Sequence, residues 1–276
     1  VEETALGTGG GIRNVYDKLR NDTVMVFNGD VLSGMDLEGI LTTHHDKDAD
    51  VTMHLLNVAD PRAFGCVPTD SNGRVTAFLE KTEDPPTNQI NAGCYVFKRS
   101  VIESIPADRV VSVERETFPG LLADGRLVVG HVDNSYWRDM GRPDDFTRGS
   151  SDLVRGIAPS PLIEGQTGES LVDPSAGIAG GVLLLSGTAV GRGSEVGAGS
   201  RLEGTVVFDG VRIEPGAIIH NSIIASGAHI GANAVIENCV IGEGAHVGAR
   251  CELLDGMRVF PGVSIPDAGV RFSSDA

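Results

Sequence analysis

The sequence predicts two structural parts: an α/β unit with a mixed or mostly parallel sheet, and then a parallel β-helix of hexapeptide repeats. In the first half, apolar runs of strand length alternate with helical patterns, whereas from about residue 172 aliphatic residues recur six positions apart in successive groups. The only Trp and all three Tyr lie before residue 140. We therefore expect an α/β domain over residues 1–156, a linker over residues 157–171 and a β-helix over residues 172–276.

The six-residue repeat contains a longer period. The aliphatics at positions 207, 213 and 219 recur at 224, 230 and 236 and then at 241, 247 and 253, so each position advances by 17 residues. Neither the 3.6-residue period of a helix nor the alternation of a simple strand produces this pattern. Three short strands per turn of a triangular coil do produce it. Each aliphatic should then point inward and stack on its equivalent one coil away.

The corners of the predicted coils have their own residue pattern. Several glycines directly follow an inward residue, where a corner needs a residue without a Cβ atom; they are Gly191, Gly197, Gly231, Gly242 and Gly248. Asn221, Asn238 and Asp255 recur at 17 residues, as a polar ladder at one corner would. The segment Asp267–Ala276 breaks the repeat, and we expect it to cap the end of the β-helix.

The first half contains the elements of an α/β sheet. Val24–Phe27 is a short apolar run that predicts a buried strand, and Asn28-Gly29-Asp30 would form the loop at its carboxyl end. We predict further strands over 51–58, 64–69, 75–81, 90–97 and 127–132, and helices over 12–19, 36–47, 113–123 and 143–155. Ligands of such sheets bind beyond the carboxyl ends of the parallel strands.

Composition excludes several classes of partner. The formal net charge of −16 argues against nucleic acid and against an anionic membrane, since both require a basic surface. No apolar run approaches the roughly 18 to 20 residues that span a bilayer. The chain begins at Val1 without a signal peptide or an initiator Met, so we expect it to start partway through a gene product. The four Cys form no Cys-x-x-Cys pair, which favours the cytoplasm.

Two aspartates follow apolar stretches and are candidate metal ligands. Asp30 ends the Val24–Phe27 region, and Asp139 follows a second apolar stretch, so the two carboxylates could meet across the sheet. Mg²⁺ takes oxygen ligands and needs only one or two protein carboxylates when phosphates and water supply the others. The alternative is that each is a turn or capping Asp.

Two further segments are candidates for substrate binding. The glycine-rich segment Leu6–Gly11 could let a base or a phosphate approach the backbone, although the Lys-Ser/Thr of a phosphate loop is absent. Glu80 and Lys81 end a predicted strand and could hold a sugar hydroxyl and a phosphate. A solvated strand end is the alternative.

Six motifs occur here in the order seen in the sugar nucleotidyltransferases; they are Leu6-Gly7-Thr8-Gly9-Gly10, Phe27-Asn28-Gly29-Asp30, Phe64-Gly65, Phe78-Leu79-Glu80-Lys81, Asn91-Ala92-Gly93-x-Tyr95 and Trp137-Arg138-Asp139-Met140-Gly141-x-Pro143. The chain resembles this family over nearly its whole length. With a hexapeptide β-helix after the first domain, it is most similar to the guanylyltransferases that act on mannose 1-phosphate. The resemblance implies a Rossmann-like nucleotidyltransferase domain followed by a left-handed parallel β-helix.

The resemblance also implies roles for particular positions. Asp30 and Asp139 match the Mg²⁺ ligands, and Gly7, Thr8, Gly9 and Gly10 match the strip that contacts base and ribose. Gly65, Glu80, Lys81, Asn91 and Gly93 match the sugar 1-phosphate pocket, with Lys81 on the phosphate and Glu80 on sugar hydroxyls. Asn28 and Gly29 are further candidates for substrate binding. The implied reaction transfers GMP from GTP to mannose 1-phosphate with Mg²⁺.

One feature of the family is absent. Its glycine-rich N-terminal loop, which ends in Arg and is followed by Lys, grips the nucleotide triphosphate, and nothing in this sequence matches it. We therefore expect the first strand and its phosphate loop to lie upstream of Val1, and the chain alone to be inactive.

Three other functions remain open. Glucose 1-phosphate with thymidine or uridine triphosphate is the nearest alternative substrate pair, and a non-catalytic regulatory or assembly subunit is another possibility. Hexapeptide acyltransferases use a His base, and His229 and His246 lie 17 residues apart in register with Arg212. However, the repeat runs from Val190 to Leu253 without the loop insertion that usually shapes an acyl-donor site.

A flat β-helix face suits subunit contacts, so we expect a homo-oligomer. We interpret His44-His45 as an exposed helix end.

Overall fold

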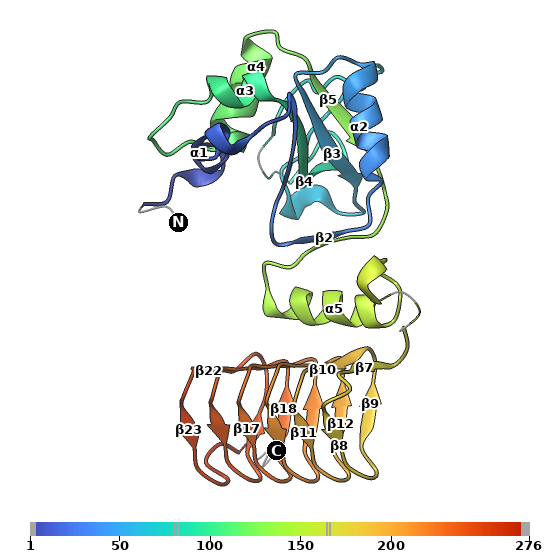
Figure 1. The fold of residues 1–276 in the computed structure, drawn as a ribbon, viewed down its shortest axis with the longest axis vertical. Helices are drawn as coiled ribbons and strands as arrows, with labels where there is room; N and C mark the ends of the chain where they lie inside the picture. The colour runs from blue at the N-terminus through green and yellow to red at the C-terminus, as the bar shows by residue number, and fades with distance from the viewer. Residues whose placement is uncertain (1–3, 80, 82, 164, 166, 272–276) are drawn as a thin grey trace. The chain divides into compact units, whose positions relative to one another are not determined.

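The computed structural model describes residues 4–79, 81, 83–163, 165 and 167–271 (Figure 1). The chain forms two compact units. The first comprises residues 1–31 and 35–137, and the second comprises residues 32–34 and 138–276.

A mixed sheet forms the centre of the first unit. Its strand order is β1 (Thr23–Phe27), β4 (Gln89–Lys98), β3 (Val51–Asn57) and β5 (Val128–Val132). β4 is antiparallel to both of its neighbours, and β3 is parallel to β5. Strands β1, β3 and β5 therefore run in the same direction, and their carboxyl ends share an edge with the amino end of β4. The sequence predicted a mixed or mostly parallel sheet, and the sheet is mixed. Both pairings of β4 are antiparallel, so only β3 and β5 pair in parallel.

Helices pack on both faces of this sheet (Figure 1). On one face α2 (Leu37–Asp46) covers a small cluster with Ile40 and Val96, and on the other face Phe97 and Phe118 belong to a larger cluster. The remaining helices of the first unit are α1 (Gly7–Asn14), η1 (Tyr16–Lys18), η2 (Pro61–Ala63), α3 (Arg99–Ser104), the π-helical turn η3 (Val113–Thr117) and α4 (Phe118–Ala123). Asp36 caps α2 by accepting a hydrogen bond from the Glu38 backbone N–H at 3.0 Å.

The predicted helix over residues 12–19 was wrong in its bounds. Helix α1 begins at Gly7, inside the glycine-rich segment, and ends at Asn14. A Cβ atom at Gly9 would lie 2.9 Å from the Val111 side chain, and one at Gly10 would lie 2.7 Å from the Arg109 carbonyl oxygen. The glycines therefore let α1 pack directly on the backbone of residues 109–111, a contact that the local pattern does not reveal.

Other local predictions also changed. Strand β1 is only half-buried and Phe27 is 54% exposed, because β1 lies at the edge of the described sheet and pairs with β4 alone. Residues 64–69 and the described residues 75–79 make isolated β-bridges rather than the predicted strands, and Pro68 has no N–H to extend a ladder. The Asn72-Gly73 turn between them does form.

His44 was predicted to be exposed, and that prediction was wrong. Its side chain is 2% exposed, with Nδ1 2.9 Å from the hydroxyl oxygen of Thr52, because the last turn of α2 lies on β3. His45 is exposed as expected.

The second unit contains the predicted parallel β-helix, with three sheets along its length (Figure 1). The first sheet consists of β7 (Ser170–Val172), β10 (Thr188–Val190), β13 (Val206–Val207), β16 (Ile223–Ile224), β19 (Val240–Ile241) and β22 (Arg258–Val259). The second consists of β8 (Gly177–Ile178), β11 (Glu195–Val196), β14 (Arg212–Ile213), β17 (His229–Ile230), β20 (His246–Val247) and β23 (Ser264–Ile265). The third consists of β9 (Leu183–Leu185), β12 (Arg201–Glu203), β15 (Ile218–His220), β18 (Val235–Glu237) and β21 (Glu252–Leu253).

The register confirms the 17-residue period. Leu202 pairs with Ile219 and Ile219 pairs with Ile236, and all three side chains are fully buried. The corner glycines are also confirmed, since a Cβ atom at Gly231 would lie 2.4 Å from the Ala249 backbone nitrogen. Asn221, Asn238 and Asp255 share a corner and adopt positive φ angles of 45°, 54° and 57°. These are conformations that Asn and Asp tolerate better than most residues.

Helix α5 (Pro143–Val154) belongs to the second unit and packs on the β-helix. Phe146 stacks on Phe208 with ring centroids 6.3 Å apart, and the Ser151 hydroxyl donates to the Ser186 carbonyl oxygen at 2.7 Å. The unit also contains η4 (Pro161–Ile163), and β2 (Val31–Ser33) pairs with β6 (Trp137–Asp139). No helix among the described residues has the length and apolar character needed to cross a membrane.

Candidate active site

The sheet edge at the carboxyl end of β1 brings together two predicted site residues. Asn28 directly follows β1, and its backbone N–H donates to the Gly93 carbonyl oxygen on β4 at 2.8 Å. Gly93 has a φ of 78°, and a Cβ atom there would lie 2.8 Å from the Asn28 side-chain nitrogen. Glycine is therefore required at position 93 by both its backbone conformation and its neighbour.

Asn91 is held in a fixed orientation beside Gly93. Its Oδ1 accepts the Gly93 backbone N–H at 3.1 Å, and its Nδ2 donates to the Tyr95 hydroxyl at 2.7 Å and to Glu114 Oε1 at 3.0 Å. Tyr95 is buried, and burial raises the pKa of its phenol, so it stays protonated. The side-chain amide of Asn91 is thus fixed at the sheet edge, with hydrogen bonds at both its oxygen and its nitrogen.

The sugar-pocket candidates Gly65 and Lys81 lie along neighbouring segments. Cys66 and Leu79 exchange two backbone hydrogen bonds of 3.0 Å, and a Cβ atom at Gly65 would lie 2.9 Å from the Leu79 carbonyl oxygen. Gly65 therefore lies against Leu79, two residues before Lys81. Lys81 is exposed. Glu80 lies outside the described residues.

Trp137 joins these segments to β4. Its indole N–H donates to the Ala92 carbonyl oxygen at 2.9 Å, and its ring meets Phe64 edge to face with centroids 5.9 Å apart. Phe64, Ile90 and Ala92 therefore belong to one apolar cluster with Trp137.

The glycine-rich candidates occupy the first turn of α1. The backbone N–H groups of Gly9 and Gly10 both donate to the Val111 carbonyl oxygen, at 2.9 and 3.3 Å, so these two groups already have a partner. The Thr8 hydroxyl accepts the Val113 backbone N–H at 2.9 Å. Because Glu114 follows Val113, α1 is connected through η3 to the Asn91 amide. Gly7 and Thr8 are exposed.

The two candidate metal ligands fall in different compact units. Asp30 and the preceding Gly29 are exposed beyond the end of β1, and Gly29 has open space where a Cβ atom would lie. Asp139 is exposed at the end of β6, and its Oδ1 accepts the Gly141 backbone N–H at 3.0 Å. The hydrogen bond to Asp139 is the turn role that the sequence analysis gave as the alternative, and it occupies Oδ1 of Asp139 but not Oδ2. That Asp30 and Asp139 act together remains a prediction.

Sequence reasoning missed Glu114 and the contact role of Tyr95. Glu114 belongs to a π-helical turn, a feature that often marks functional sites and that no residue pattern announces. Tyr95 lies in the quoted Asn91 motif, and its four-residue separation from Asn91 on one strand was the available signal.

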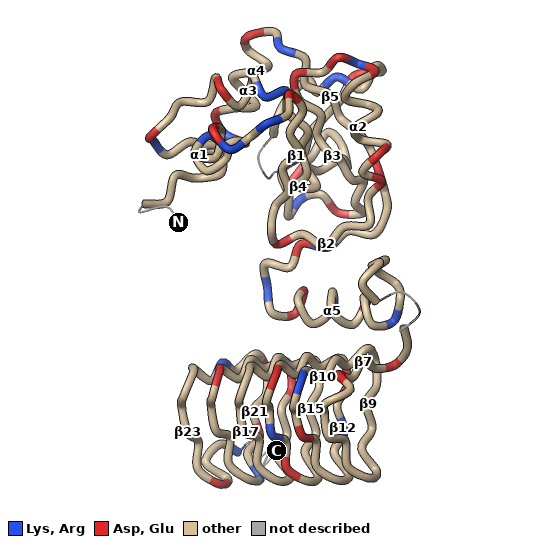
Figure 2. Tube along the Cα trace, in the orientation of Figure 1, with Lys and Arg blue, Asp and Glu red and all other residues tan. Residues whose placement is uncertain are grey.

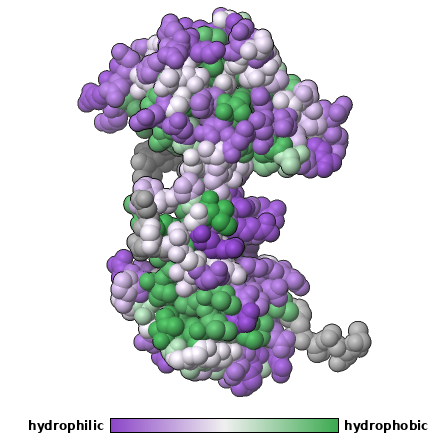
Figure 3. Space-filling view, turned by 90° about the vertical axis from the view of Figure 1, so that its right-hand side faces the viewer, coloured by the Kyte–Doolittle hydropathy of each residue, from purple (hydrophilic) through white to green (hydrophobic). Residues whose placement is uncertain are grey.

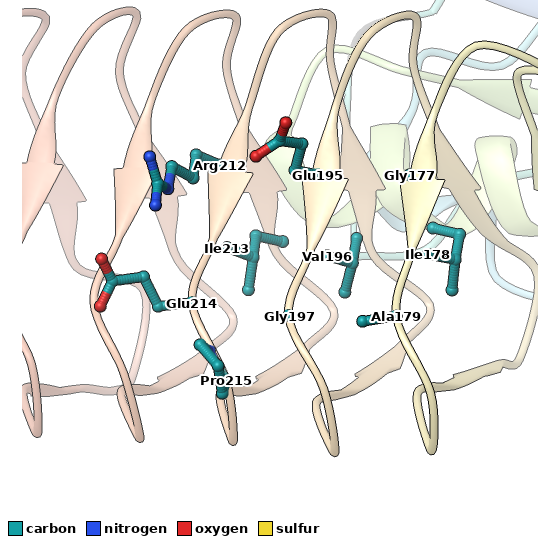
Figure 4. Close-up of a pocket in the computed structure, with 10 residues that line it drawn as sticks. All are labelled: Gly177, Ile178, Ala179, Glu195, Val196, Gly197, Arg212, Ile213, Glu214 and Pro215. Atoms are coloured by element: carbon teal, nitrogen blue, oxygen red, sulfur yellow. The ribbon is translucent and has the colours of Figure 1, made fainter.

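The β-helix has a surface hollow that contains none of the predicted site residues. It lies over β8, β11 and β14 and is lined by Glu195, Arg212 and Glu214 together with small residues such as Gly177, Ala179 and Gly197 (Figure 4). None of the candidate active-site residues lies in the β-helix.

The shared register of the two β-helix histidines, predicted from their 17-residue spacing, is confirmed. His229 pairs in register with His246 and with Arg212. His229 Nε2 lies 3.0 Å from Glu214 Oε1, and this hydrogen bond lowers the pKa of Glu214. Both side chains are about one-third exposed.

Comparisons with known proteins agree with this architecture. The nucleotidyl transferase family matches residues 1–156, and the GMPPB C-terminal domain family matches residues 166–269. Mannose-1-phosphate guanylyltransferase of Mycobacterium tuberculosis is 66% identical over 275 residues, which are 99% of this chain and 77% of that protein. Mannose-1-phosphate guanylyltransferase 1 of Arabidopsis thaliana is 36% identical over 210 residues, covering 73% of this chain and 58% of that protein.

A solved structure is also similar to part of the chain. HddC from Yersinia pseudotuberculosis complexed with GMP-PN has a TM-score of 0.49 and 26% identity over 55% of this chain and 64% of its own.

The fold, the two family matches and the identity to curated relatives define the class, a nucleotidyltransferase unit followed by a β-helix of hexapeptide repeats. Within that class, the chain belongs to the mannose-1-phosphate guanylyltransferase family. The resemblance that the ordered motifs predicted is therefore confirmed.

Proposed function

We propose that the protein carrying this chain transfers GMP from GTP to mannose 1-phosphate, giving GDP-mannose and pyrophosphate. The observation that carries the proposal is the 66% identity to the Mycobacterium tuberculosis enzyme over 99% of the chain. It is supported by the position of Asn28, Asn91 and Gly93 at the edge where the parallel strands end, which is where open α/β sheets bind ligands.

The reaction requires little acid–base chemistry. A phosphate oxygen of mannose 1-phosphate attacks the α-phosphorus of GTP; one P–O bond forms, and the bond to the oxygen bridging the α- and β-phosphorus atoms breaks, releasing pyrophosphate. The second pKa of a phosphate monoester is about 6, so the attacking group is already largely a dianion at neutral pH. The protein must chiefly hold two anions in line and reduce their repulsion.

The chain's own residues are proposed to hold the sugar 1-phosphate. Lys81, which is exposed, would bind the phosphate, and Glu80 would accept hydrogen bonds from sugar hydroxyls. Gly65, Asn91 and Gly93 would leave room for the sugar and supply backbone groups. The buried Tyr95 and the Glu114 carboxylate fix the Asn91 amide, which keeps this part of the pocket preorganised.

The base and ribose of GTP are proposed to lie against the Gly7 to Gly10 turn. Because the Gly9 and Gly10 N–H groups donate to Val111, contact there would rest on shape and on the exposed Gly7 and Thr8 rather than on a free helix N-terminus. Asn28 and Gly29 would contribute backbone at the neighbouring strand end.

Mg²⁺ is the proposed cofactor, with Asp30 and Asp139 as its protein ligands. Among the described residues no cluster of three or more His, Cys, Asp or Glu could hold a metal. Two exposed carboxylates nevertheless fit Mg²⁺, because this ion commonly takes one or two protein carboxylates and completes its shell with phosphates and water. When bound, it would neutralise charge on the transferring phosphate group.

Two further features belong to the proposal. We propose that the protein works in the cytoplasm and that the chain self-associates through its β-helix. The cytoplasm is supported by four buried Cys that are all free. Self-association is supported by the flat β-helix faces.

The test measures pyrophosphate release by the complete gene product with Mg²⁺, each nucleoside triphosphate, and mannose or glucose 1-phosphate. We expect the fastest release with GTP and mannose 1-phosphate. Asp30→Asn, Asp139→Asn and Lys81→Ala should each lower turnover by about 100-fold or more without loss of folding, because all three side chains are exposed. Asn at position 139 can still accept the Gly141 N–H, so the turn is preserved.

Asp108→Asn is the matched control, since Asp108 is exposed and has a φ of 55° that Asn readily adopts. An unchanged rate in Asp139→Asn would remove the metal assignment. Faster release with another substrate pair would overturn the proposed specificity.

A further inference from the structure

Helix α5 carries two carboxylates with a glycine between them on one face. Asp145, Gly149 and Asp152 follow one another at intervals of four and three residues, so their side chains form a single stripe along the helix. Gly149 is buried, although glycine is unfavourable in the interior of a helix. A close neighbour is the usual reason for such a glycine, and the structure supplies one.

The neighbour is Arg138 of strand β6. Its Nη1 lies 3.5 Å from Asp145 Oδ1, and its Nη2 lies 3.1 Å from Asp152 Oδ2. The three side chains are between 17% and 28% exposed, so the ion pairs are largely shielded from water. A Cβ atom at Gly149 would lie 3.4 Å from Arg138 Cδ, and the glycine thus leaves room for the arginine stem. Arg138 is therefore held on α5 by both its charge and its stem.

Met140, which follows Asp139, is held on the same helix. A Cβ atom at Gly149 would lie 3.0 Å from the Met140 sulfur. Arg138 and Met140 thus share one face of this extended segment, and the alternation of side chains along a strand places Asp139 on the other face. With both of its neighbours fixed, the direction in which the Asp139 side chain leaves the backbone is fixed too. The Gly141 backbone N–H, bonded to Oδ1, then restricts its rotation.

Helix α5 is itself fixed on the β-helix. Its Phe146 ring stacks on Phe208, and its Ser151 hydroxyl donates to a β-helix carbonyl oxygen. A Cβ atom at Gly187 would lie 2.5 Å from Ser151 Oγ, so this corner of the β-helix lies directly against the helix. Figure 3 shows strongly hydrophilic residues on the surface at the level of α5, above a hydrophobic face of the β-helix. The helix is thus a rigid support with a polar side.

The charges of this segment balance one another. Residues 138–155 contain four Arg and four Asp, in a chain whose net charge is −16 (Figure 2). Arg138 lies between two of these carboxylates. Removing it would leave both Asp145 and Asp152, which are mostly buried, without this cation, and such a loss weakens the contact between the segments that the pair joins.

We infer that Arg138 is a positioning residue, which holds the candidate metal ligand Asp139 in place by anchoring β6 to α5. The inference rests on the proposed function, because it takes Asp139 as a ligand of Mg²⁺. Residues that orient a metal ligand typically change metal affinity by roughly 10- to 100-fold when they are removed. Through α5, the β-helix would support this ligand, which gives it a part in the reaction without a catalytic residue of its own.

The first experiment measures metal binding without turnover. Mn²⁺, a substitute for Mg²⁺ whose free ion gives a paramagnetic resonance signal, is titrated into the complete gene product with GDP-mannose present. We expect Arg138→Met to raise the dissociation constant of Mn²⁺ about tenfold, and Arg138→Lys to raise it about threefold, since lysine lacks the planar fork that meets two carboxylates. Arg148→Met removes the same charge from an exposed position of α5 and should leave the constant unchanged.

Pyrophosphate release provides a second readout. With Arg138→Met, turnover should approach that of the unaltered protein as Mg²⁺ is raised, whereas Asp139→Asn should stay slow at every Mg²⁺ concentration. The two carboxylates should act only through the arginine. Adding Asp145→Asn and Asp152→Asn to Arg138→Met should therefore weaken Mn²⁺ binding no further. Thermal unfolding of each variant establishes that it is folded.

The outcomes separate this inference from the proposed function. Unchanged Mn²⁺ binding in Asp139→Asn would overturn the metal assignment and, with it, the role of Arg138. Weaker binding in Asp139→Asn together with unchanged binding in both Arg138 variants would overturn the positioning role alone, even if those variants unfold at a lower temperature. If Arg138→Met does not fold, Arg138→Lys and Asp152→Asn decide by the same criterion.

Discussion

The two units bury their cores by different means. In the β-helix, each inward aliphatic lies on its equivalent from the neighbouring coil, as in the row of Leu202, Ile219 and Ile236. In the α/β unit, strand β3 is buried on both faces, and polar side chains such as His44 and Thr52 share the interior with Phe97. A repeated local contact can be recognised from spacing, whereas an interior assembled from distant segments cannot.

The same difference affects how the stability of each unit should respond to substitutions in its core. Coils of a β-helix are stabilised mainly by nearest neighbours. The core around Phe118 depends instead on Phe78 and on two residues of β4, Tyr95 and Phe97, all of which are distant from Phe118 in the sequence. The predictions below test whether the two units behave as independent structures.

The largest effects are expected from truncating the two cores. Phe118→Ala should lower the free energy of unfolding of the first unit by about 3–5 kcal/mol, and Ile219→Ala should lower that of the β-helix by about 2–5 kcal/mol, because both side chains are fully buried. Denaturant unfolding should be followed by fluorescence of Trp137, the only Trp, and by far-UV circular dichroism. Fluorescence reports on the first unit.

Phe118→Ala should move the fluorescence transition, while Ile219→Ala should move the dichroism transition and leave fluorescence unchanged. If both probes shift together in both variants, the units unfold as one and the comparison between them fails.

An intermediate effect is expected from acid. Burial, with a smaller contribution from His45, lowers the pKa of His44 from 6.5 to about 4, and burial also lowers the pKa values of His54 and His131. The unfolded chain therefore binds these protons before the folded chain does. Stability is fully present above about pH 6.5 and falls as the pH drops toward 4, with His44 alone contributing up to about 3 kcal/mol.

The measurement is the free energy of unfolding at pH 7.5 and pH 4.5, taken from Trp137 fluorescence, for the unaltered chain and for His44→Asn. The variant should lose less stability between the two pH values, because Asn does not titrate and can still bond to Thr52. An equal loss in both proteins would show that His44 is not responsible. His45→Asn, at an exposed position, is the control and should resemble the unaltered chain.

The smallest effect concerns a glycine that the structure does not require. Gly120 lies in α4, lacks a positive φ and has open space at its Cβ position, so Gly120→Ala should raise stability by about 0.5–1 kcal/mol. Gly125, at the end of the same region, has a φ of 71°, and Gly125→Ala should have the opposite sign. Thermal unfolding of the pair measures both changes, and a stabilised Gly125→Ala would contradict the argument.

Prediction from sequence succeeded where local chemistry and periodicity were sufficient. The register of the β-helix, the backbone contact at Gly231 and the positive φ of Asn221 follow from spacing, because the same contact repeats in each coil. The helix bounds around Gly7 were wrong, since glycine has little helical preference and the helix is fixed by the distant carbonyl of Val111.

The candidate site shows the same division. The motif order singled out Asn28, Asn91 and Gly93, and the structure places the three together. Glu114 was missed because it reaches Asn91 from a π-helical turn 23 residues away. The roles of all these residues in catalysis, and the joint action of Asp30 and Asp139, remain predictions.

The sequence by itself determined the family, the α/β class and the complete register of the β-helix, since each of these depends on short motifs or on a fixed period. Tertiary structure alone decided which way β4 runs and that His44 is buried. Those outcomes depend on contacts between residues far apart in the chain, and such contacts are selected by the packing of the whole unit rather than by the preferences of any one segment.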